Sequence, residues 1–199
     1  MSTPYPNGFP VIFDLGSRPC LLVGAGRIAY RKAEQLLKAG AELTVVAPQV
    51  LPEFESLPVR IVRREFKATD LDGVWLVVTA TGNTEVDQFI FDQSESRRIW
   101  CNSADDPKRC SFILPAVHRR GPITVAISTG GASPALASWL RAEIAALVGP
   151  EFEELVSRLA AERVNVKSAG NSTEDIDWKP IIASICDELG IVSVRKVTT

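Results

Sequence analysis

A glycine-rich segment near the N-terminus carries the residue types that bind phosphate groups. Gly24-Ala25-Gly26-Arg27-Ile28-Ala29 follows an apolar run from Pro19 to Val23 and precedes a segment with helical periodicity. Glycines at this spacing allow a tight turn after a strand, and they let a pyrophosphate approach the amides that begin the next helix. The segment predicts a dinucleotide site, with a glycine-rich turn that binds nothing as the alternative.

The end of the second predicted strand lacks the acidic residue that usually holds the adenosine ribose of NAD. The chain has Val46-Ala47-Pro48-Gln49 there, and Glu42 comes too early in the strand. Backbone groups around Pro48 and Gln49 remain able to hold a ribose. This strand therefore leaves the choice between NAD and NADP open.

Two further polar turns follow predicted strands, and we expect them at the same ligand-binding edge of the sheet. Thr79-Ala80-Thr81-Gly82-Asn83 follows the fourth strand, and its small residues allow a cofactor to lie close. The turn from Asn102 to Lys108 follows the fifth strand and contains Asp105 and Asp106, adjacent carboxylates that could supply a general base. Ordinary polar turns are the alternative for both.

Basic side chains gather in the sequence near the second of these turns. They are Lys108, Arg109, His118, Arg119 and Arg120, with Arg27, Arg31 and Lys32 on the first predicted helix. Such a set could bind a polycarboxylate through charge-assisted hydrogen bonds, or it could form a solvated face. His118 is the single histidine and is predicted to lie in an exposed turn, so a mechanism that needs two histidines is excluded.

Strands that alternate with helices must position these residues. The pattern predicts strands over 19–23, 43–47, 59–62, 74–79, 98–101, 111–114 and 123–128, a helix after Gly26 and another over 85–97. This alternation is typical of an α/β protein with a Rossmann-type, doubly wound parallel sheet and helices on both faces. After Ser128 the pattern predicts helices over 135–148, 150–162 and 180–189, with a polar linker over 167–177.

The composition excludes several classes of protein. With 199 residues, of which 46% are hydrophobic, and a net charge of -2, the chain suits one globular domain with a smaller appendage. It has no global basic field for nucleic acid, no long apolar span and no signal-peptide pattern, so we expect a cytoplasmic protein that binds neither nucleic acid nor a membrane. The four cysteines are scattered, which favours reduced thiols and no permanent metal site.

Three segments together resemble the siroheme synthase family, specifically its precorrin-2 dehydrogenase and sirohydrochlorin ferrochelatase module. They are FPVIFDLGSRPCLLVGAGRIAYRKAEQLLKAGAELTVVAP, ESRRIWCNSADDPKRCSFILPA and ITVAISTGGASPALASWLR. The resemblance implies NAD-dependent oxidation of precorrin-2 to sirohydrochlorin and, in some members, insertion of ferrous iron to give sirohaem. We expect the stand-alone form, without the methyltransferase domain that is fused in some relatives.

The resemblance also assigns roles to individual residues. The family's catalytic aspartate, which lies in an Asn-x-x-Asp-x-Pro loop, falls on Asp105. The implied NAD contacts fall on Gly24, Ala25, Gly26, Arg27, Ile28, Pro48, Gln49 and Thr81. The implied contacts with the tetrapyrrole fall on Asn102, Lys108, Ser128, Thr129, Gly130 and Gly131, and Thr129 stands where one class of members carries a regulatory phosphoserine.

The resemblance further implies a homodimer, in which a second, mostly helical region makes the dimer and helps to close the tetrapyrrole cleft. We therefore expect an NAD-binding Rossmann domain over 1–114, a dimerisation region over 115–148 and a helical C-terminal region over 149–199. Two alternatives stay open, a metal chelatase that needs no NAD and a noncatalytic module that binds a nucleotide or a tetrapyrrole. If the protein acts on a metal ion, we expect that ion to be a substrate and not a permanently bound cofactor.

Overall fold

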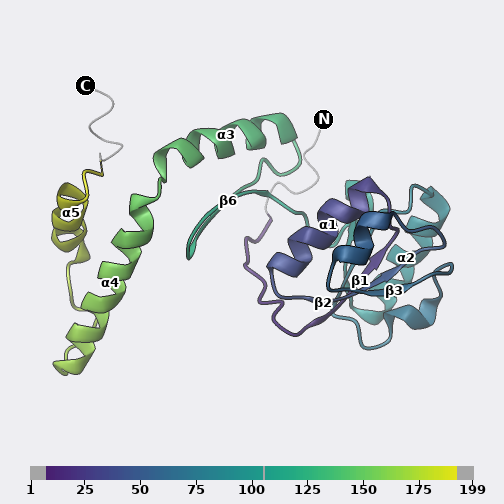
Figure 1. The fold of residues 1–199 in the computed structure, drawn as a ribbon, viewed down its shortest axis with the longest axis horizontal. Coiled ribbons are helices and arrows are strands. Elements are labelled where there is room, and N and C mark those ends of the chain that lie inside the picture. Colours follow the sequence, from purple (N-terminus) through teal and green to yellow (C-terminus); the bar gives the residue numbers. More distant parts are fainter. Residues whose placement is uncertain (1–7, 105, 192–199) are drawn as a thin grey trace. The chain divides into compact units, whose positions relative to one another are not determined.

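A computed structural model describes residues 8–104 and 106–191 (Figure 1). The chain divides into two compact units, Met1–Leu114 and Pro115–Thr199, and each is described by itself. No helix among the described residues is both long and apolar enough to cross a membrane.

The first unit is built on a five-stranded parallel sheet with the strand order β3-β2-β1-β4-β5. Its elements are β1 (Pro19–Val23), α1 (Arg27–Lys38), β2 (Glu42–Val46), β3 (Arg60–Val62), β4 (Leu76–Thr79), α2 (Thr84–Arg97) and β5 (Trp100–Ser103), with short 3-10 helices η1 (Pro52–Ser56), η2 (Ala68–Leu71) and η3 (Pro107–Arg109). The strand order reverses at β1, so a crevice opens where the carboxyl ends of β1, β2 and β4 meet.

The sheet is buried on both of its faces. Ala29 and Ala33 of α1 pack in one apolar cluster with Leu22 of β1. Ile90 of α2 packs in a second cluster with Leu21, the neighbouring residue of the same strand. Because successive side chains of a strand point to opposite faces, the two clusters place α1 and α2 on opposite sides of the sheet. The predicted Rossmann-type α/β fold is confirmed.

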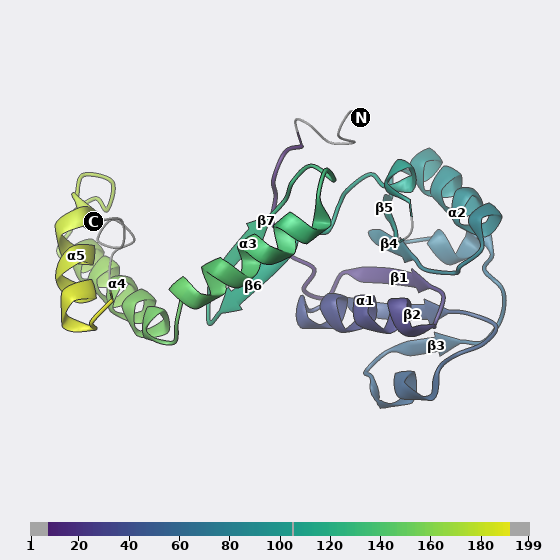
Figure 2. The ribbon, with the colours of Figure 1, turned by 90° about the horizontal axis from the view of Figure 1, so that it is seen from above.

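In the described part of the second unit, a β-hairpin is followed by helices (Figure 2). Its elements are β6 (Ala116–Arg120), β7 (Ile123–Ile127), α3 (Pro134–Leu147), α4 (Glu151–Ser168) and α5 (Trp178–Glu188). Helix α3 packs on the hairpin, and α5 packs on α4. Ser133 accepts a hydrogen bond from the amide of Leu136 at 3.2 Å and so caps α3, as the Ser-Pro sequence predicts.

The strand predicted over 111–114 is wrong, because this segment is held by isolated contacts instead of a ladder. The Ser111 amide donates to the Cys101 carbonyl at 2.8 Å, and the Asn102 side chain donates to the Phe112 carbonyl at 2.9 Å. Pro115 follows and has no amide hydrogen to continue a ladder. The strand β6, which the sequence pattern did not predict, begins at the next residue.

The prediction that His118 lies in an exposed turn is also wrong. His118 lies in β6 with 9% of its surface exposed, and its Nε2 is 3.3 Å from the carbonyl oxygen of Val148 at the end of α3. The turn begins only at Gly121, which has a φ of +50°. The adjacent arginines in the sequence suggested a turn three residues too early, because β6 continues through Arg120.

The buried cysteines provide a test of the core. Burial raises the pKa of Cys20 to about 11 and that of Cys101 to about 12. At pH 8, we expect iodoacetamide to modify both thiols at least about 100-fold more slowly in the folded protein than in urea, because the thiolate is the reactive form. Mass spectrometry of tryptic peptides measures these rates, and equal rates in both states would contradict the buried placement.

The same shifts predict a pH dependence of stability. Both thiols have a higher pKa in the folded protein than in the unfolded chain, so they favour folding fully below about pH 8.5. This contribution is lost as the pH rises toward 11. Urea titrations should therefore give a lower free energy of unfolding at pH 10.5 than at pH 8, and Cys20→Ala should reduce that difference.

Candidate dinucleotide-binding site

The turn after β1 packs directly against the turn after β4. Gly24 has a φ of +104°, and a Cβ at this position would overlap the carbonyl oxygen of Ala80 and lie 2.7 Å from its carbonyl carbon. The amide of Ala80 donates to Val23 and the amide of Gly24 donates to Val46, both at 2.9 Å. These contacts join the ends of β1, β2 and β4, and only glycine fits at position 24.

The start of α1 is open to a bound anion. Gly26 is its N-cap residue, no described side chain caps it, and the first turn has no acidic residue. A Cβ built on Gly26 would meet nothing within 4 Å. The helices α2, α3 and α5 differ, since the side chains of Asn83, Ser133 and Asp177 cap them. The uncapped amides of α1 and the open space beside them fit a pyrophosphate.

A pocket of about 690 Å³ lies at this crevice. Six residues predicted to contact the cofactor line it, namely Gly24, Ala25, Gly26, Pro48, Gln49 and Thr81. The other two, Arg27 and Ile28, occupy the first turn of α1 and are not among the lining residues. The volume is typical of a small-molecule site, and the close backbone approach at Gly24 supplies the cradle that a dinucleotide needs.

One wall of this pocket consists of residues that the sequence pattern did not indicate. Glu65 and Phe66 line it from the segment after β3, and Val86 and Phe89 line it from α2. The rings of Phe66 and Phe89 meet edge to face with centroids 6.1 Å apart. The predicted Rossmann-type fold contained a signal for Glu65 and Phe66, because in such a sheet the third strand lies beside the second and their carboxyl ends share one edge.

Thr81 acts within its own turn. Its hydroxyl donates to Asp87 Oδ1 at 2.7 Å and accepts from the amide of Asn83 at 3.0 Å. Asp87 is only 2% exposed, and Asn83 Oδ1 accepts from the amide of Glu85 at 3.0 Å and caps α2. Because its hydroxyl bonds to Asp87 and Asn83, Thr81 contributes to the pocket mainly by fixing the conformation of the turn.

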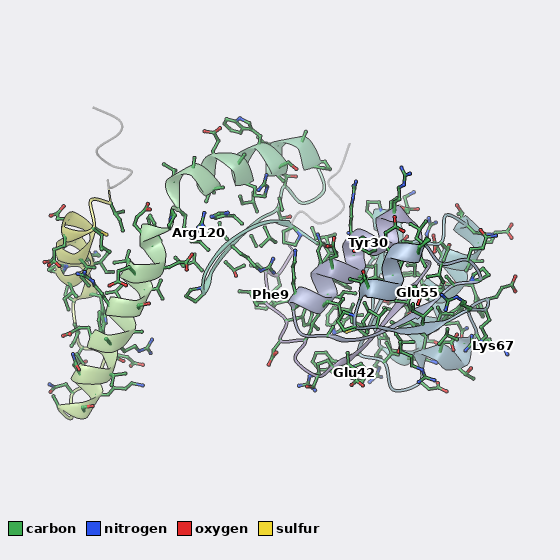
Figure 3. The ribbon with its side chains drawn as sticks, in the orientation of Figure 1. Phe9, Tyr30, Glu42, Glu55, Lys67 and Arg120 are labelled. Atoms are coloured by element: carbon green, nitrogen blue, oxygen red, sulfur yellow. The ribbon has the colours of Figure 1, made fainter. Side chains whose placement is uncertain are left out.

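Glu42 is excluded as a ribose-binding residue by its position. Glu42, labelled in Figure 3, is the first residue of β2. It pairs with Pro19, the first residue of β1. The pocket lies beyond the last residue of that strand, Val46. The sequence-based exclusion of Glu42 therefore agrees with the structure.

Of the two adjacent carboxylates after β5, Asp106 builds the turn. One of its oxygens accepts from the Lys108 amide at 2.9 Å, and the other is 3.2 Å from a guanidinium nitrogen of Arg109. Asp105 lies outside the described residues. The Asn102 amide group is buried and engaged by Phe112, whereas Lys108 is exposed. The roles predicted for Asp105, Asn102 and Lys108 stay predictions.

The predicted basic set is divided between the two units. Arg27, Arg31 and Lys108 are exposed in the first unit, and Lys32 is partly buried there, where burial lowers its pKa. His118, Arg119 and Arg120 belong to β6 in the second unit, and Figure 3 labels Arg120. Among the described residues, no three His, Cys, Asp or Glu side chains gather as ligands for a metal ion.

The loop between β7 and α3 contains the remaining predicted site residues. The Thr129 hydroxyl accepts from the Ser133 amide at 3.0 Å, and the Ser128 hydroxyl accepts from the Gly130 amide at 3.1 Å. Gly130 and Gly131 have φ values of +62° and +88°, which suit glycine. These bonds fix the shape of the loop, and its contact with a substrate stays a prediction.

Two family models match separate segments of the chain. Residues 11–116 match a family described as "Putative NAD(P)-binding". Residues 120–147 match a family described as "Sirohaem biosynthesis protein central". The predicted nicotinamide dinucleotide cofactor is thereby supported, and the pocket described above lies inside the first match.

Individual relatives cover most of this chain. Siroheme synthase 3 of Aeromonas hydrophila is 40% identical over 94% of the chain, and siroheme synthase of Salmonella dublin is 43% identical over 79%. The chain spans only 41% and 35% of these two proteins. The solved structure of SirC, a precorrin-2 dehydrogenase, is 28% identical with a TM-score of 0.73, and the match covers 95% of this chain and 94% of SirC.

Two glycine substitutions should separate folding from cofactor binding. We expect Gly26→Ala to fold with a loss of at most about 1 kcal/mol, because its φ is ordinary and the surrounding space is open. Its methyl group would occupy the place of the pyrophosphate, so NAD⁺ should bind at least about tenfold more weakly. Calorimetric titration and thermal melting measure the two effects.

Gly24→Ala is the matched comparison. Its Cβ overlaps backbone atoms of Ala80, so we expect a loss of several °C in Tm even without a ligand. A Gly26→Ala protein that binds NAD⁺ as tightly as the wild type would place the pyrophosphate elsewhere.

Proposed function

Because the chain belongs to the siroheme synthase family and carries its NAD(P)-binding domain, we propose that it oxidises precorrin-2 to sirohydrochlorin with NAD⁺ as the oxidant. The observation that carries this proposal is the similarity to the precorrin-2 dehydrogenase SirC, which extends over 95% of this chain and 94% of that one. A shared Rossmann fold alone would not identify a substrate. A match that extends from the dinucleotide domain through the second unit is more specific.

The dinucleotide pocket supports the oxidative half of this function. In the bound state NAD⁺ supplies a hydride acceptor. The chain's own part is to hold the cofactor in place, with the pyrophosphate beside Gly24 and Gly26 and against the amides of α1. The contact between the turns at Gly24 and Ala80 fixes the floor of the pocket, and Pro48 and Gln49 form its wall at the end of β2.

We assign the general base to Asp105. Dehydrogenation removes a hydride and a proton from the substrate, and a carboxylate within hydrogen-bond reach can accept the proton. Its neighbour Asp106 is engaged by the Lys108 amide and by Arg109. Because Asp106 is engaged within its own turn, we favour Asp105 as the carboxylate that accepts the proton from the substrate.

The remaining roles concern substrate and assembly. We propose that Asn102, Lys108 and the loop from Ser128 to Gly131 contact the tetrapyrrole, with cationic side chains pairing with its carboxylates. We further propose a cytoplasmic homodimer in which residues 115–148 form the interface. The exposed Leu136 and Trp139 of α3 support an interface on that helix, because each has an apolar side chain about half exposed.

Insertion of ferrous iron into sirohydrochlorin is the second candidate function. The similarity to two siroheme synthases favours it. Iron would be a substrate here, and Asp105 could collect the pyrrole protons that the metal displaces. This reaction requires the tetrapyrrole site and does not require NAD⁺.

One anaerobic assay tests both reactions. The purified protein is mixed with enzymatically generated precorrin-2 and NAD⁺, and NADH absorbance and the tetrapyrrole spectrum are followed before and after addition of ferrous iron. NADH together with sirohydrochlorin is the expected result. A folded protein that binds NAD⁺ and yields no NADH would refute the dehydrogenase, and an iron-dependent change above the uncatalysed rate would establish the chelatase.

We predict that Asp105→Asn lowers kcat for NADH formation by about 100-fold or more and changes the Kd for NAD⁺ by less than about threefold, because it removes the base and leaves the pocket. Asp72→Asn is the matched control, since Asp72 is exposed, does not line the pocket and lies between η2 and β4. Normal turnover by a folded Asp105→Asn protein would remove Asp105 from the mechanism.

A nucleotide-site variant should separate the two reactions from each other. Gly26→Asp places a carboxylate in open space beside the pyrophosphate site, whereas any side chain at Gly24 overlaps Ala80. We expect Gly26→Asp to abolish NADH formation and to leave iron insertion into supplied sirohydrochlorin unchanged. Loss of both reactions in a folded variant would mean that the chelatase also needs the nucleotide site.

A further inference from the structure

Glu65 is the only charged residue among the described residues that line the dinucleotide pocket. It follows β3, and neither lysine nor arginine is among the lining residues described. The nearest aromatic neighbour in the chain, Phe66, lines the same wall and packs against Phe89. The charge is therefore located beside the apolar end of the pocket, where a flat ring can bind between apolar side chains.

The strand register relates Glu65 to the position where an acidic residue was expected. Val46 of β2 pairs with Val62 of β3 in parallel. Gln49 and Glu65 each lie three residues beyond their paired valine, and both line the pocket. Because the two strands end side by side, Glu65 brings a carboxylate to the pocket wall beside the end of β2, where an acidic residue is missing.

The two arginines that precede Glu65 in the chain are held by other carboxylates. Arg64 donates to both carboxylate oxygens of Asp70, at 2.6 and 2.7 Å, and this contact lowers the pKa of Asp70. Arg63 is paired with Glu55. Lys67 is exposed at the outer edge of the first unit (Figure 3) and does not line the pocket.

We propose that Glu65 makes this site selective for NAD over NADP. Its carboxylate accepts a hydrogen bond from the 2′-hydroxyl of the adenosine ribose, and it repels the 2′-phosphate that distinguishes NADP. A phosphate monoester carries about -1.5 to -2 charges at neutral pH, and an unpaired anion beside it opposes binding. This inference rests on the dinucleotide site of the proposed function and deepens it by naming the residue that chooses the cofactor.

The test is direct binding to the full chain without a tetrapyrrole. Calorimetric titration with NAD⁺ and NADP⁺ should give at least about tenfold tighter binding of NAD⁺ to the wild type. Glu65→Gln should lower this ratio to about threefold or less, mainly by tightening the binding of NADP⁺. Glu53→Gln is the matched control, because Glu53 is exposed on η1 outside the pocket and its removal changes net charge equally.

A second measurement needs no variant. ADP-ribose and 2′-phospho-ADP-ribose differ only at the 2′ position, so the wild type should bind the first at least about tenfold more tightly. Equal binding of the two compounds, a ratio that a folded Glu65→Gln protein leaves unchanged, or an equal change in Glu53→Gln would overturn the role of Glu65. Failure of the folded wild type to bind either dinucleotide would overturn it as well.

The assignment of cofactor choice and the proposed reaction can fail separately. A protein that prefers NAD⁺ through Glu65 and yields no NADH from precorrin-2 refutes only the reaction. A protein that oxidises precorrin-2 equally well with both cofactors refutes only the role of Glu65.

Discussion

The backbone of Gly24 lies against the carbonyl of Ala80, and the rest of the site depends on this approach. It sets the turn after β1 beside the turn after β4, and it requires a φ of +104° that only glycine adopts without strain. The hydrogen bond from Ala80 to Val23 and that from Gly24 to Val46 fix three strand ends together. The crevice at the reversal of strand order follows directly from this arrangement.

The polar groups around these strand ends are of two kinds. Some hold the turns in place, and others are available to a ligand. Thr81, Asp87 and Asn83 bond to one another and to the start of α2, and Asp106 bonds within its own turn. The start of α1 has no side-chain cap among the described residues, and its N-cap residue Gly26 lines the pocket. The fold thus satisfies these turns internally and leaves the start of α1 available to an anion.

The charged side chains near the pocket are likewise of two kinds, because some are paired within the fold and one lines the pocket. The guanidinium of Arg64 is engaged by Asp70, and Glu65 is the only charged residue among the described residues that line the pocket. A site with one negative charge beside the adenosine ribose and helix amides beside the pyrophosphate treats these two parts of a dinucleotide differently. That difference could not be deduced from net composition, because the chain as a whole is nearly neutral.

The sequence by itself determined the α/β fold and the glycine turn, because the period of buried residues and the spacing of Gly24 and Gly26 are local properties. The sequence pattern did not predict β6, because the charged residues next to Gly121 suggested a turn where the structure has a strand that buries His118. Only the tertiary structure brought Glu65 and Phe89 into one pocket, since the register of β2 with β3 and the packing of α2 join residues distant in the chain. Pairing across strands is a nonlocal property, and a single sequence does not specify which of its charges will be neutralised there.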